Sequence, residues 1–272
     1  MTMKTSGNNI TIPVQDISIV YNDWGNSNVP LIFIHGFPFN KSTWDKQLEY
    51  LQQFTRVIAY DVRGFGQSSN NTDECSITMF ADDLIDFMDA LQIDRAIVCG
   101  LSMGGYIILN AISRYKHRFA GIILCDTQCI ADTNAVREKR YATIEQIKQE
   151  GTENYALAFV KNMFTNQSVE QHKPFVAEIK NSITANKSSS IISGLKALAN
   201  RAATCSELGD IDIPTLIICG KEDMVTPIAQ SIFLQENIPN AKLVLIDNAA
   251  HLSNIEQPEI FNNTLLDFIQ KV

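Results

Sequence analysis

Short apolar runs alternate with longer amphipathic segments in the first half of the chain. The runs ISIVYNDWG, LIFIHG, RVIAYD, RAIVCG and AGIILCD are rich in β-branched and other apolar residues, which predicts strands buried on both faces of a sheet. Between them, apolar residues at helical spacing predict helices over residues 44–53, 77–91 and 103–115. Strands and helices in alternation predict βαβ units and a mostly parallel sheet flanked by helices.

This alternation stops after Asp126 and resumes near the C-terminus. Residues 127–201 contain polar-rich helical patterns and no convincing strand, whereas IPTLIICGKED and KLVLID again resemble strands. PEIFNNTLLDFIQ predicts a closing amphipathic helix. We therefore expect an α/β core domain of residues 1–126 and 202–272, interrupted by a helical cap of residues 127–201. Such a cap would lie over the C-terminal ends of the strands, where open α/β sheets bind ligands.

Composition and charge narrow the possible partners of the protein and its cellular compartment. The chain has 272 residues, 45% of them hydrophobic, and a net charge of −8, which argues against nucleic acid or an anionic membrane as the main partner. The N-terminus lacks the apolar segment of a secretory signal, and no run is suited to crossing a membrane. The six cysteines form no C-x-x-C pair, and Cys99, Cys125 and Cys219 fall in apolar runs. We expect no disulfide framework and a reducing, cytoplasmic setting.

The segment IVCGLSMGGY contains the most specific motif in the chain. Gly100, Ser102 and Gly104 match G-x-S-x-G, with a predicted buried strand before the motif and a helix after it. In that context the serine occupies a tight, strained turn that lifts its hydroxyl above the sheet, and the flanking glycines avoid collisions. The alternative is an ordinary strand–helix turn with an incidental serine. We predict that Ser102 is a nucleophile.

A serine nucleophile needs a base, and four histidines are candidates. His251 follows the predicted strand KLVLID and precedes the last helix, which is where the base is expected when the chain order is serine, acid, histidine. His117 and His172 fit that order less well, and His35 is better explained as a structural residue that braces the loop beside it. The alternative for His251 is a surface residue in a polar loop.

The acid that orients the base has two principal candidates. Asp223 follows a late strand and precedes a helix, whereas Asp126 ends the strand AGIILCD. We favour Asp223, with its neighbour Glu222 as a weaker choice. The acid would accept a hydrogen bond from Nδ1 of His251, so that Nε2 can take the proton of Ser102.

Acyl transfer also requires hydrogen-bond donors for the developing oxyanion. The backbone N–H of Met103 stands at the start of the predicted helix and is one donor. The second is expected from HGFPFN, the loop after the first parallel strand, where Gly36 allows an unusual backbone turn and Phe37 would present its N–H.

In order along the chain, HGFP, DVRGFGQS, GLSMGG, GKEDMVTP and HLSNIEQPE resemble the landmarks of the α/β-hydrolase superfamily. The resemblance covers essentially the whole chain and implies the α/β-hydrolase fold. A serine at position 102 argues against the haloalkane dehalogenase and epoxide hydrolase branches, which place aspartate there. The segment AAHLSNIEQPEIF is similar to the corresponding end of 3-oxoadipate enol-lactonases and carboxylesterase-like members. The cofactor-free haloperoxidase and perhydrolase branch looks similar too and shares the triad.

The segment DVRGFGQSS is tempting as a nucleotide loop but lacks the third glycine of G-x-G-x-x-G. Asp61 and Arg63 are better explained as residues that fix this loop. We expect neither a cofactor nor a metal ion.

The predicted cap contains groups that could contact a substrate, although each has a plainer explanation. Four apolar residues could line an acyl pocket or simply pack: Phe159, Met163, Phe164 and Phe175. Three cations could face an anionic substrate or solvent: Arg137, Arg140 and Lys161.

We therefore expect a serine hydrolase that cleaves small-molecule esters or lactones through an acyl-enzyme on Ser102. The alternatives are a perhydrolase and a receptor that binds a ligand with negligible turnover. The sequence is compatible with a monomer or a homodimer.

Overall fold

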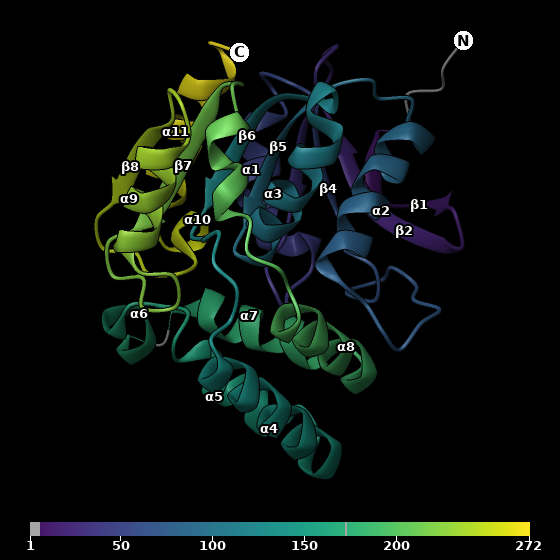
Figure 1. Ribbon diagram of the computed structural model, residues 1–272, viewed down its shortest axis with the longest axis vertical. Coiled ribbons are helices and arrows are strands. Elements are labelled where there is room, and N and C mark those ends of the chain that lie inside the picture. Colours follow the sequence, from purple (N-terminus) through teal and green to yellow (C-terminus); the bar gives the residue numbers. More distant parts are fainter. Residues whose placement is uncertain (1–5, 172) are drawn as a thin grey trace.

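An eight-stranded sheet forms the centre of the protein in the computed structural model, which describes residues 6–171 and 173–272 (Figure 1). The strand order is β1-β2-β4-β3-β5-β6-β7-β8. β1 and β2 pair antiparallel, β2 is also antiparallel to β4, and all the other pairs are parallel. The strands are β1 (Gly7–Val14), β2 (Ile17–Trp24), β3 (Leu31–Ile34), β4 (Val57–Tyr60), β5 (Ala96–Leu101), β6 (Phe119–Cys125), β7 (Thr215–Gly220) and β8 (Lys242–Ile246).

The burial of the strands explains why most of them are predictable from the sequence. Every residue of β3, β4, β5 and β7 is buried, as expected for parallel strands covered on both faces. β1 was missing from the sequence prediction. It lies at the edge of the sheet and consists of exposed and half-buried residues apart from the buried Val14, so it lacks the continuous apolar run by which the other strands were found.

Helices cover both faces of the sheet. In Figure 1, α2 and α3 pack side by side in front of the sheet, and α1 lies behind it, where it contacts α11. The long helices match their predicted ranges to within a few residues, and the side chain of Ser76 caps the start of α2 by accepting from the N–H of Met79. The elements are η1 (Lys41–Trp44), α1 (Asp45–Leu51), α2 (Ile77–Ala90), α3 (Met103–Tyr115), η2 (Lys116–Arg118), η3 (Cys205–Asp210), α9 (Ile228–Asn237), α10 (Ser253–Glu256) and α11 (Pro258–Ile269).

Within the part of the chain that the structure describes, five further α-helices lie between β6 and β7, and we call them the helical insertion. They gather beyond one end of the sheet in Figure 1. A Cβ atom at Gly194 of α8 would collide with the rings of Phe37 and Phe65, so α8 lies directly against the loops that follow β3 and β4. The helices are α4 (Asn134–Glu150), α5 (Glu153–Val160), α6 (Asn166–Glu170), α7 (Pro174–Thr184) and α8 (Ser188–Ala199).

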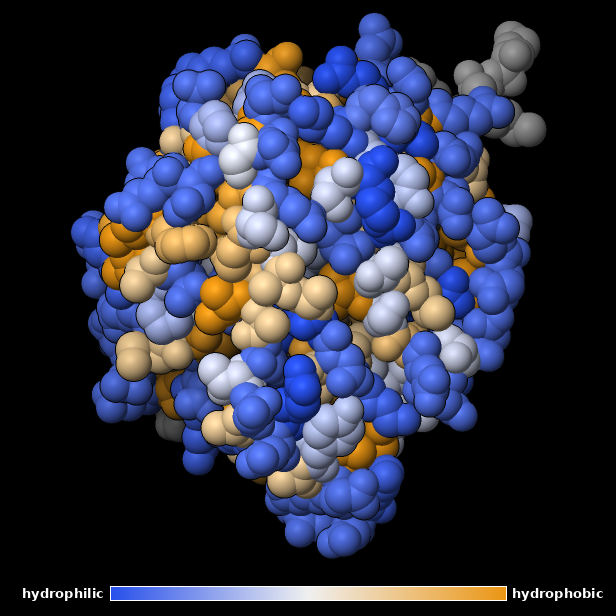
Figure 2. All heavy atoms as spheres, viewed as in Figure 1, coloured by the Kyte–Doolittle hydropathy of each residue, from blue (hydrophilic) through white to orange (hydrophobic). Residues whose placement is uncertain are grey.

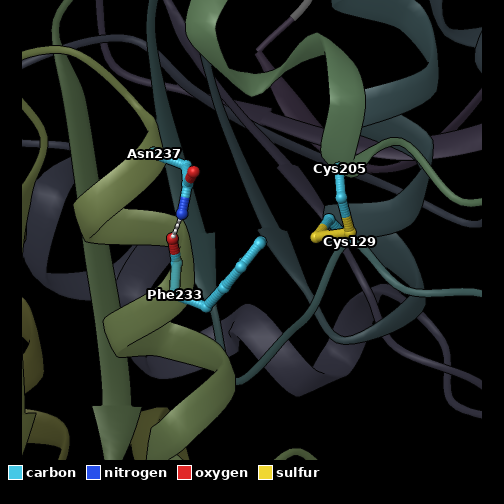
Figure 3. The surroundings of a disulfide bond; sticks show 4 residues. All are labelled: Cys129, Cys205, Phe233 and Asn237. Atoms are coloured by element: carbon cyan, nitrogen blue, oxygen red, sulfur yellow. Dashed lines mark hydrogen bonds between the residues drawn. A yellow bond between two sulfur atoms is a disulfide. The ribbon is translucent and has the colours of Figure 1, made fainter.

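A disulfide bond joins the two ends of the helical insertion. Cys129 follows β6, Cys205 begins η3, and Figure 3 shows Phe233 of α9 pointing toward their bond. The expectation that the cysteines form no disulfide is wrong for this pair, because a partner 76 residues away cannot be deduced from cysteine spacing. Cys99, Cys125 and Cys219 are free and buried, as their apolar surroundings predicted.

The surface has both hydrophilic and apolar areas. Figure 2 shows hydrophilic residues over much of the viewed face, with apolar residues in separate areas between them. Among the described residues, no helix has both the length and the apolar character needed to cross a membrane.

Loss of the Cys129–Cys205 bond is expected to lower the free energy of unfolding by about 3–5 kcal/mol, because the bond closes a long loop and restricts the unfolded chain. Urea denaturation of the wild type with and without dithiothreitol measures this difference. The double variant Cys129→Ser, Cys205→Ser is the control and should not respond to the reductant. Equal midpoints for the oxidised and reduced wild type would contradict the prediction.

Candidate active site

Ser102 occupies a strained turn between β5 and α3. Its φ is 52° and its ψ is −110°, a conformation that costs free energy in a residue with a side chain and is often found at functional sites. A Cβ atom at Gly100 would collide with the backbone of Gly104, and a Cβ at Gly104 would collide with the carbonyl oxygen of Ile34. Both flanking positions therefore require glycine, as the motif predicted.

The neighbouring strand β6 holds this turn in place. The N–H of Ser102 donates to the carbonyl oxygen of Cys125 at 2.9 Å. The hydroxyl of Thr127 donates to the carbonyl oxygen of Ser102 at 2.8 Å. Sequence reasoning did not single out Thr127, since a threonine just after a strand has no distinctive pattern.

Asp223 and His251 form a buried pair. Nδ1 of His251 donates to Oδ2 of Asp223 at 2.8 Å, and their side chains are 2% and 0% exposed. The carboxylate also accepts from the N–H groups of Val225 and Thr226 and from the hydroxyl of Thr226, at 2.7, 3.0 and 2.7 Å. Because Nδ1 carries the proton in this bond, Nε2 is left as a proton acceptor. The adjacent Glu222 is exposed and makes no bond to His251 among the described residues.

Their surroundings shift the pKa values of both members of this pair. Burial alone would lower the pKa of His251, but the charge of Asp223 and the hydrogen bond to it raise it. Burial alone would raise the pKa of Asp223, but the charge and hydrogen bond of His251 and the bonds from Thr226 lower it. The arrangement therefore stabilises a protonated His251 beside an ionised carboxylate, as general base catalysis requires.

Asp126, the alternative acid, has a different environment. It makes no hydrogen bond to His251 within the described part of the chain. Its carboxyl accepts from the N–H of Gly220 at 2.8 Å and bonds to the hydroxyl of Ser253 at 2.6 Å. Burial, together with the nearby charge of Asp223, raises the pKa of Asp126 to about 8. Burial thus favours the protonated form of this carboxyl, and the geometry favours Asp223 as the partner of His251.

His35 fixes the loop that was predicted to supply an oxyanion donor. Its Nε2 accepts from the N–H of Val62 at 3.0 Å, so Nδ1 must carry the proton that it shares with the carbonyl oxygen of Gly36 at 2.9 Å. A peptide group is planar, and the N–H of Phe37 therefore points away from that anchored carbonyl. The structural role predicted for His35 is confirmed.

The two predicted oxyanion donors lie close to the serine turn. A Cβ atom built on Gly36 would be 3.4 Å from Cβ of Ser102, so the loop that carries Phe37 touches the turn. Met103 is the first residue of α3, and its N–H has no acceptor within the helix. None of the backbone hydrogen bonds of the described residues uses the N–H of Phe37.

The sheet brings these groups to one edge. Ser102 follows β5, Asp223 follows β7 and His251 follows β8, and β5, β6, β7 and β8 are parallel neighbours. Their carboxyl ends therefore meet at the same side of the sheet. No hydrogen bond joins Ser102 to His251 among the described residues, and such bonds commonly tighten only when a substrate is bound.

The loop after β4 has the structural role that was expected. The carboxylate of Asp61 accepts from the backbone N–H and from Nζ of Lys41, both at 2.8 Å, and from the N–H of Gln67 at 2.9 Å. Arg63 forms a bidentate ion pair with Asp83 at 2.6 and 2.7 Å. These bonds hold the loop against its neighbours and leave neither side chain free for chemistry.

Apolar residues of the helical insertion differ in how they relate to the site. The ring of Phe159 lies edge-on to Phe37, with centroids 6.2 Å apart, and so borders the loop that follows β3. Phe164 packs on Phe175 at 5.2 Å. The carbonyl of Met163 accepts from the N–H of Leu252, next to His251, at 3.2 Å.

The cations of the insertion are mostly engaged within it. Arg140 pairs with Asp132 at 2.5 Å, and Nε of Arg137 donates to the carbonyl oxygen of Ala199 at 3.0 Å. Lys161 is exposed. His172 lies outside the described residues.

Glu256 links the helical insertion to the loop of His251, and sequence reasoning missed it. Its Oε2 accepts from the N–H of Ala250 at 2.8 Å. Its Oε1 accepts from the N–H and hydroxyl of Thr165 and from the hydroxyl of Ser168, at 3.0, 2.9 and 2.6 Å. The segment SNIEQPE contained this residue, but a single glutamate gives no sign of a partner about 90 residues away.

One group of potential metal ligands lies beside the site. Asp126, Cys219 and Asp223 have their ligand atoms within 4.8 Å of one another. Asp223 is already committed to His251, and burial raises the pKa of the Cys219 thiol, which opposes the thiolate that metals bind. These three groups are therefore better suited to sharing protons than to binding a metal cation.

Comparison with known proteins agrees with this geometry. A family model for the α/β-hydrolase fold matches residues 29–258. A 3-oxoadipate enol-lactonase of Acinetobacter baylyi is 32% identical over 257 residues, which is 94% of each chain. A thermophilic esterase of Thermogutta terrifontis, solved with malate bound, superposes with a TM-score of 0.92 at 28% identity, over 96% of this chain and 98% of the other. The enol-lactonase of Burkholderia xenovorans LB400 gives 0.90 at 27% identity, over 96% and 100%.

The chain belongs to the α/β-hydrolase family. This confirms the fold class and the family expected from the sequence.

Neutral Asp126 makes stability depend on pH. Between its unfolded pKa near 3.8 and its native pKa of about 8, the native state holds a proton that the unfolded chain has released, so stability falls as pH rises through that window. The variant Asp126→Asn removes this proton and should show a shallower decline. Urea denaturation between pH 5 and about pH 9 compares the two proteins. Parallel curves for variant and wild type would show that Asp126 is ionised in the native state.

Glu256→Gln should lower kcat/KM for an ester by about tenfold, because it weakens charge-assisted bonds to Ala250, Thr165 and Ser168 that hold the His251 loop. Steady-state kinetics measures the change. Glu259→Gln is the matched control, since Glu259 is an exposed residue of α11, and it should leave the rate unchanged. An equal effect of both substitutions would count against a positioning role for Glu256.

Proposed function

We propose that the protein is a serine hydrolase that cleaves small carboxylic esters or lactones through an acyl-enzyme on Ser102. The observation that carries the proposal is the buried hydrogen bond between His251 and Asp223, at the sheet edge where Ser102 stands in its strained turn. The ester- and lactone-cleaving activities named for the relatives support the same reaction class.

The proposed reaction proceeds in two steps. His251 Nε2 takes the proton of Ser102 while its Oγ attacks the substrate carbonyl, and the backbone N–H groups of Phe37 and Met103 stabilise the oxyanion. The protonated His251 then gives its proton to the leaving alkoxide, and the acyl group stays on Ser102. Water that loses a proton to His251 attacks the acyl-enzyme, and Ser102 leaves with that proton. In a lactone, the leaving alcohol stays attached to the acyl chain.

The proposal also covers the cap, the size of the substrate, the oligomeric state and the cellular location. Residues 127–201 act as a cap over a core of residues 1–126 and 202–272, and the ring of Phe159 in this cap lies edge-on to Phe37. The substrate is a small molecule, and the protein works as a monomer or a homodimer. A cytoplasmic setting stays a prediction, and the Cys129–Cys205 bond weakens its basis because such bonds are rare in reducing compartments.

A fluorophosphonate probe should label Ser102 stoichiometrically, because the activated hydroxyl attacks phosphorus as it attacks a carbonyl. Intact-protein mass spectrometry measures the adduct. The wild type should also turn over p-nitrophenyl esters or lactones repeatedly, and Ser102→Ala or His251→Ala should lower kcat by about 10³-fold or more.

Two controls separate the alternatives. Asp126→Asn should retain turnover at pH 7, whereas Asp223→Asn should lose most of it, since of these two carboxyl groups it is Asp223 that bonds to His251. Binding of esters without repeated turnover would indicate a receptor, and activity that requires peroxide and a short-chain acid would indicate a perhydrolase. Absence of both the adduct and turnover in folded protein would overturn the proposal.

A further inference from the structure

The side chain of Asn186 joins the helical insertion to two loops of the core. It lies in the turn between α7 and α8 and is 5% exposed. Its Oδ1 accepts from the N–H of Gly66, in the loop after β4, at 2.8 Å. Its Nδ2 donates to the carbonyl oxygen of Pro38, in the loop after β3, at 2.8 Å, and to the carbonyl oxygen of Ser182 at 3.1 Å. One buried amide therefore bonds three separate segments of the chain.

These partners require an amide at position 186. The group faces one N–H donor and two carbonyl acceptors, so the orientation of its oxygen and nitrogen is fixed. The bond to Ser182 has a plain structural explanation, because the last four carbonyl groups of α7 have no partner within the helix. The bonds to Pro38 and Gly66 are not needed to end a helix, and they connect the insertion to the core.

The bond from Asn186 falls on a peptide group that shapes the loop after β3. The carbonyl of Pro38 and the N–H of Phe39 belong to this one group, and the N–H donates to the carbonyl oxygen of Gly36 at 2.9 Å. A trans peptide group is planar, and its C=O and N–H point in opposite directions. By holding the carbonyl of Pro38, Asn186 therefore orients the N–H of Phe39 toward Gly36.

The carbonyl of Gly36 belongs in turn to the peptide group that carries the N–H of Phe37, the proposed oxyanion donor. Nδ1 of His35 also donates to this carbonyl, at 2.9 Å. Two donors thus fix the second peptide plane, and one of them, the N–H of Phe39, is oriented by the insertion through Asn186. Hydrogen bonds in such a series also polarise one another.

The other bond of Asn186 reaches a firmly held part of the core. Gly66 precedes Gln67, whose N–H donates to the carboxylate of Asp61 at 2.9 Å. The same carboxylate accepts from Nζ of Lys41, which lies just beyond the loop after β3, at 2.8 Å. The two loops are therefore tied to each other by a buried ion pair, and Asn186 seats the insertion on both.

We propose that Asn186 is a positioning residue that couples the helical insertion to the oxyanion donor of Phe37. The inference rests on the function proposed for Ser102. The connection runs from Nδ2 of Asn186 through the peptide group that follows Pro38 to the peptide group between Gly36 and Phe37. A correctly seated insertion thereby aligns the N–H of Phe37, so the insertion contributes to the rate of acyl transfer in addition to any part in binding the substrate.

Steady-state turnover of p-nitrophenyl acetate and inhibition by trifluoroacetophenone test this role. In the inhibitor adduct, Oγ of Ser102 bonds to the ketone carbon, the hydroxyl proton passes to His251, and the ketone oxygen becomes an oxyanion. This oxygen requires the same donors as the oxyanion of the reaction. A loss of alignment at Phe37 should therefore weaken inhibition and slow turnover together.

Two variants remove the bond to Pro38 in different ways. Asn186→Asp keeps an acceptor for Gly66 but loses both donated bonds, and Asn186→Ala removes all the bonds without adding a charge. Each should lower kcat by about tenfold with little change in KM, and raise the inhibition constant of trifluoroacetophenone by about tenfold. The loss is smaller than removal of an oxyanion donor would cause, because His35 still holds the loop. Asn181→Asp, at an exposed asparagine of α7, is the charge-matched control and should match the wild type.

Each other outcome overturns a defined part of the proposal. Unchanged kcat in both Asn186 variants, each with native circular dichroism, would show that the bond to Pro38 does not position the donor. A rise in KM alone would limit Asn186 to seating the insertion, and a fall in kcat without weaker inhibition would place the loss away from the oxyanion. Either result contradicts the inference. A folded wild type without ester turnover or a fluorophosphonate adduct would instead overturn the function proposed for Ser102.

Discussion

The strained backbone of Ser102 is the constraint on which the site depends. A side chain at positive φ is held only where the surroundings fix it more strongly than the strain opposes it. Here β5 enters the turn, α3 leaves it, and Gly100 and Gly104 let the backbone segments approach one another. The bonds to Cys125 and Thr127 come from the end of the adjacent strand β6 and the loop that follows it. The buried parallel sheet thereby fixes the position of the Ser102 hydroxyl group.

Two carboxyl groups at this edge acquire opposite properties from their partners. Asp223 accepts hydrogen bonds from His251, Val225 and Thr226, which favour the ionised form. Asp126 is buried beside that charge, and its own bonds do not offset the burial, so its pKa rises to about 8. Two adjacent buried anions would repel each other, and keeping one neutral removes that cost. The sequence favoured Asp223 over Asp126, and the hydrogen bond between Asp223 and His251 supports that preference.

Local sequence patterns predicted most of the strands and the position of Ser102. Contacts between segments far apart in the chain could not be predicted in this way. Continuous apolar runs indicated the buried strands. The motif G-x-S-x-G identified Ser102, because the local backbone leaves no room for a side chain at the two glycine positions. β1 was missed because an edge strand has a weak pattern. The Cys129–Cys205 bond and the contacts of Glu256 join residues far apart in the chain. Neither cysteine spacing nor an isolated glutamate specifies its partner.

The buried arginines of this chain differ in how their charges are paired. Arg56 and Arg63 each place their Nε and Nη2 edge on an aspartate, and each completes its charge within the chain. Arg201 is more deeply buried, but its carboxylate partner is shared with Arg140 and lies on another edge. If Arg201 served only packing, an apolar side chain could fill the space without a charge to desolvate. The guanidinium of Arg201 is instead held by the shared charge of Asp132 and by the face of the Tyr106 ring.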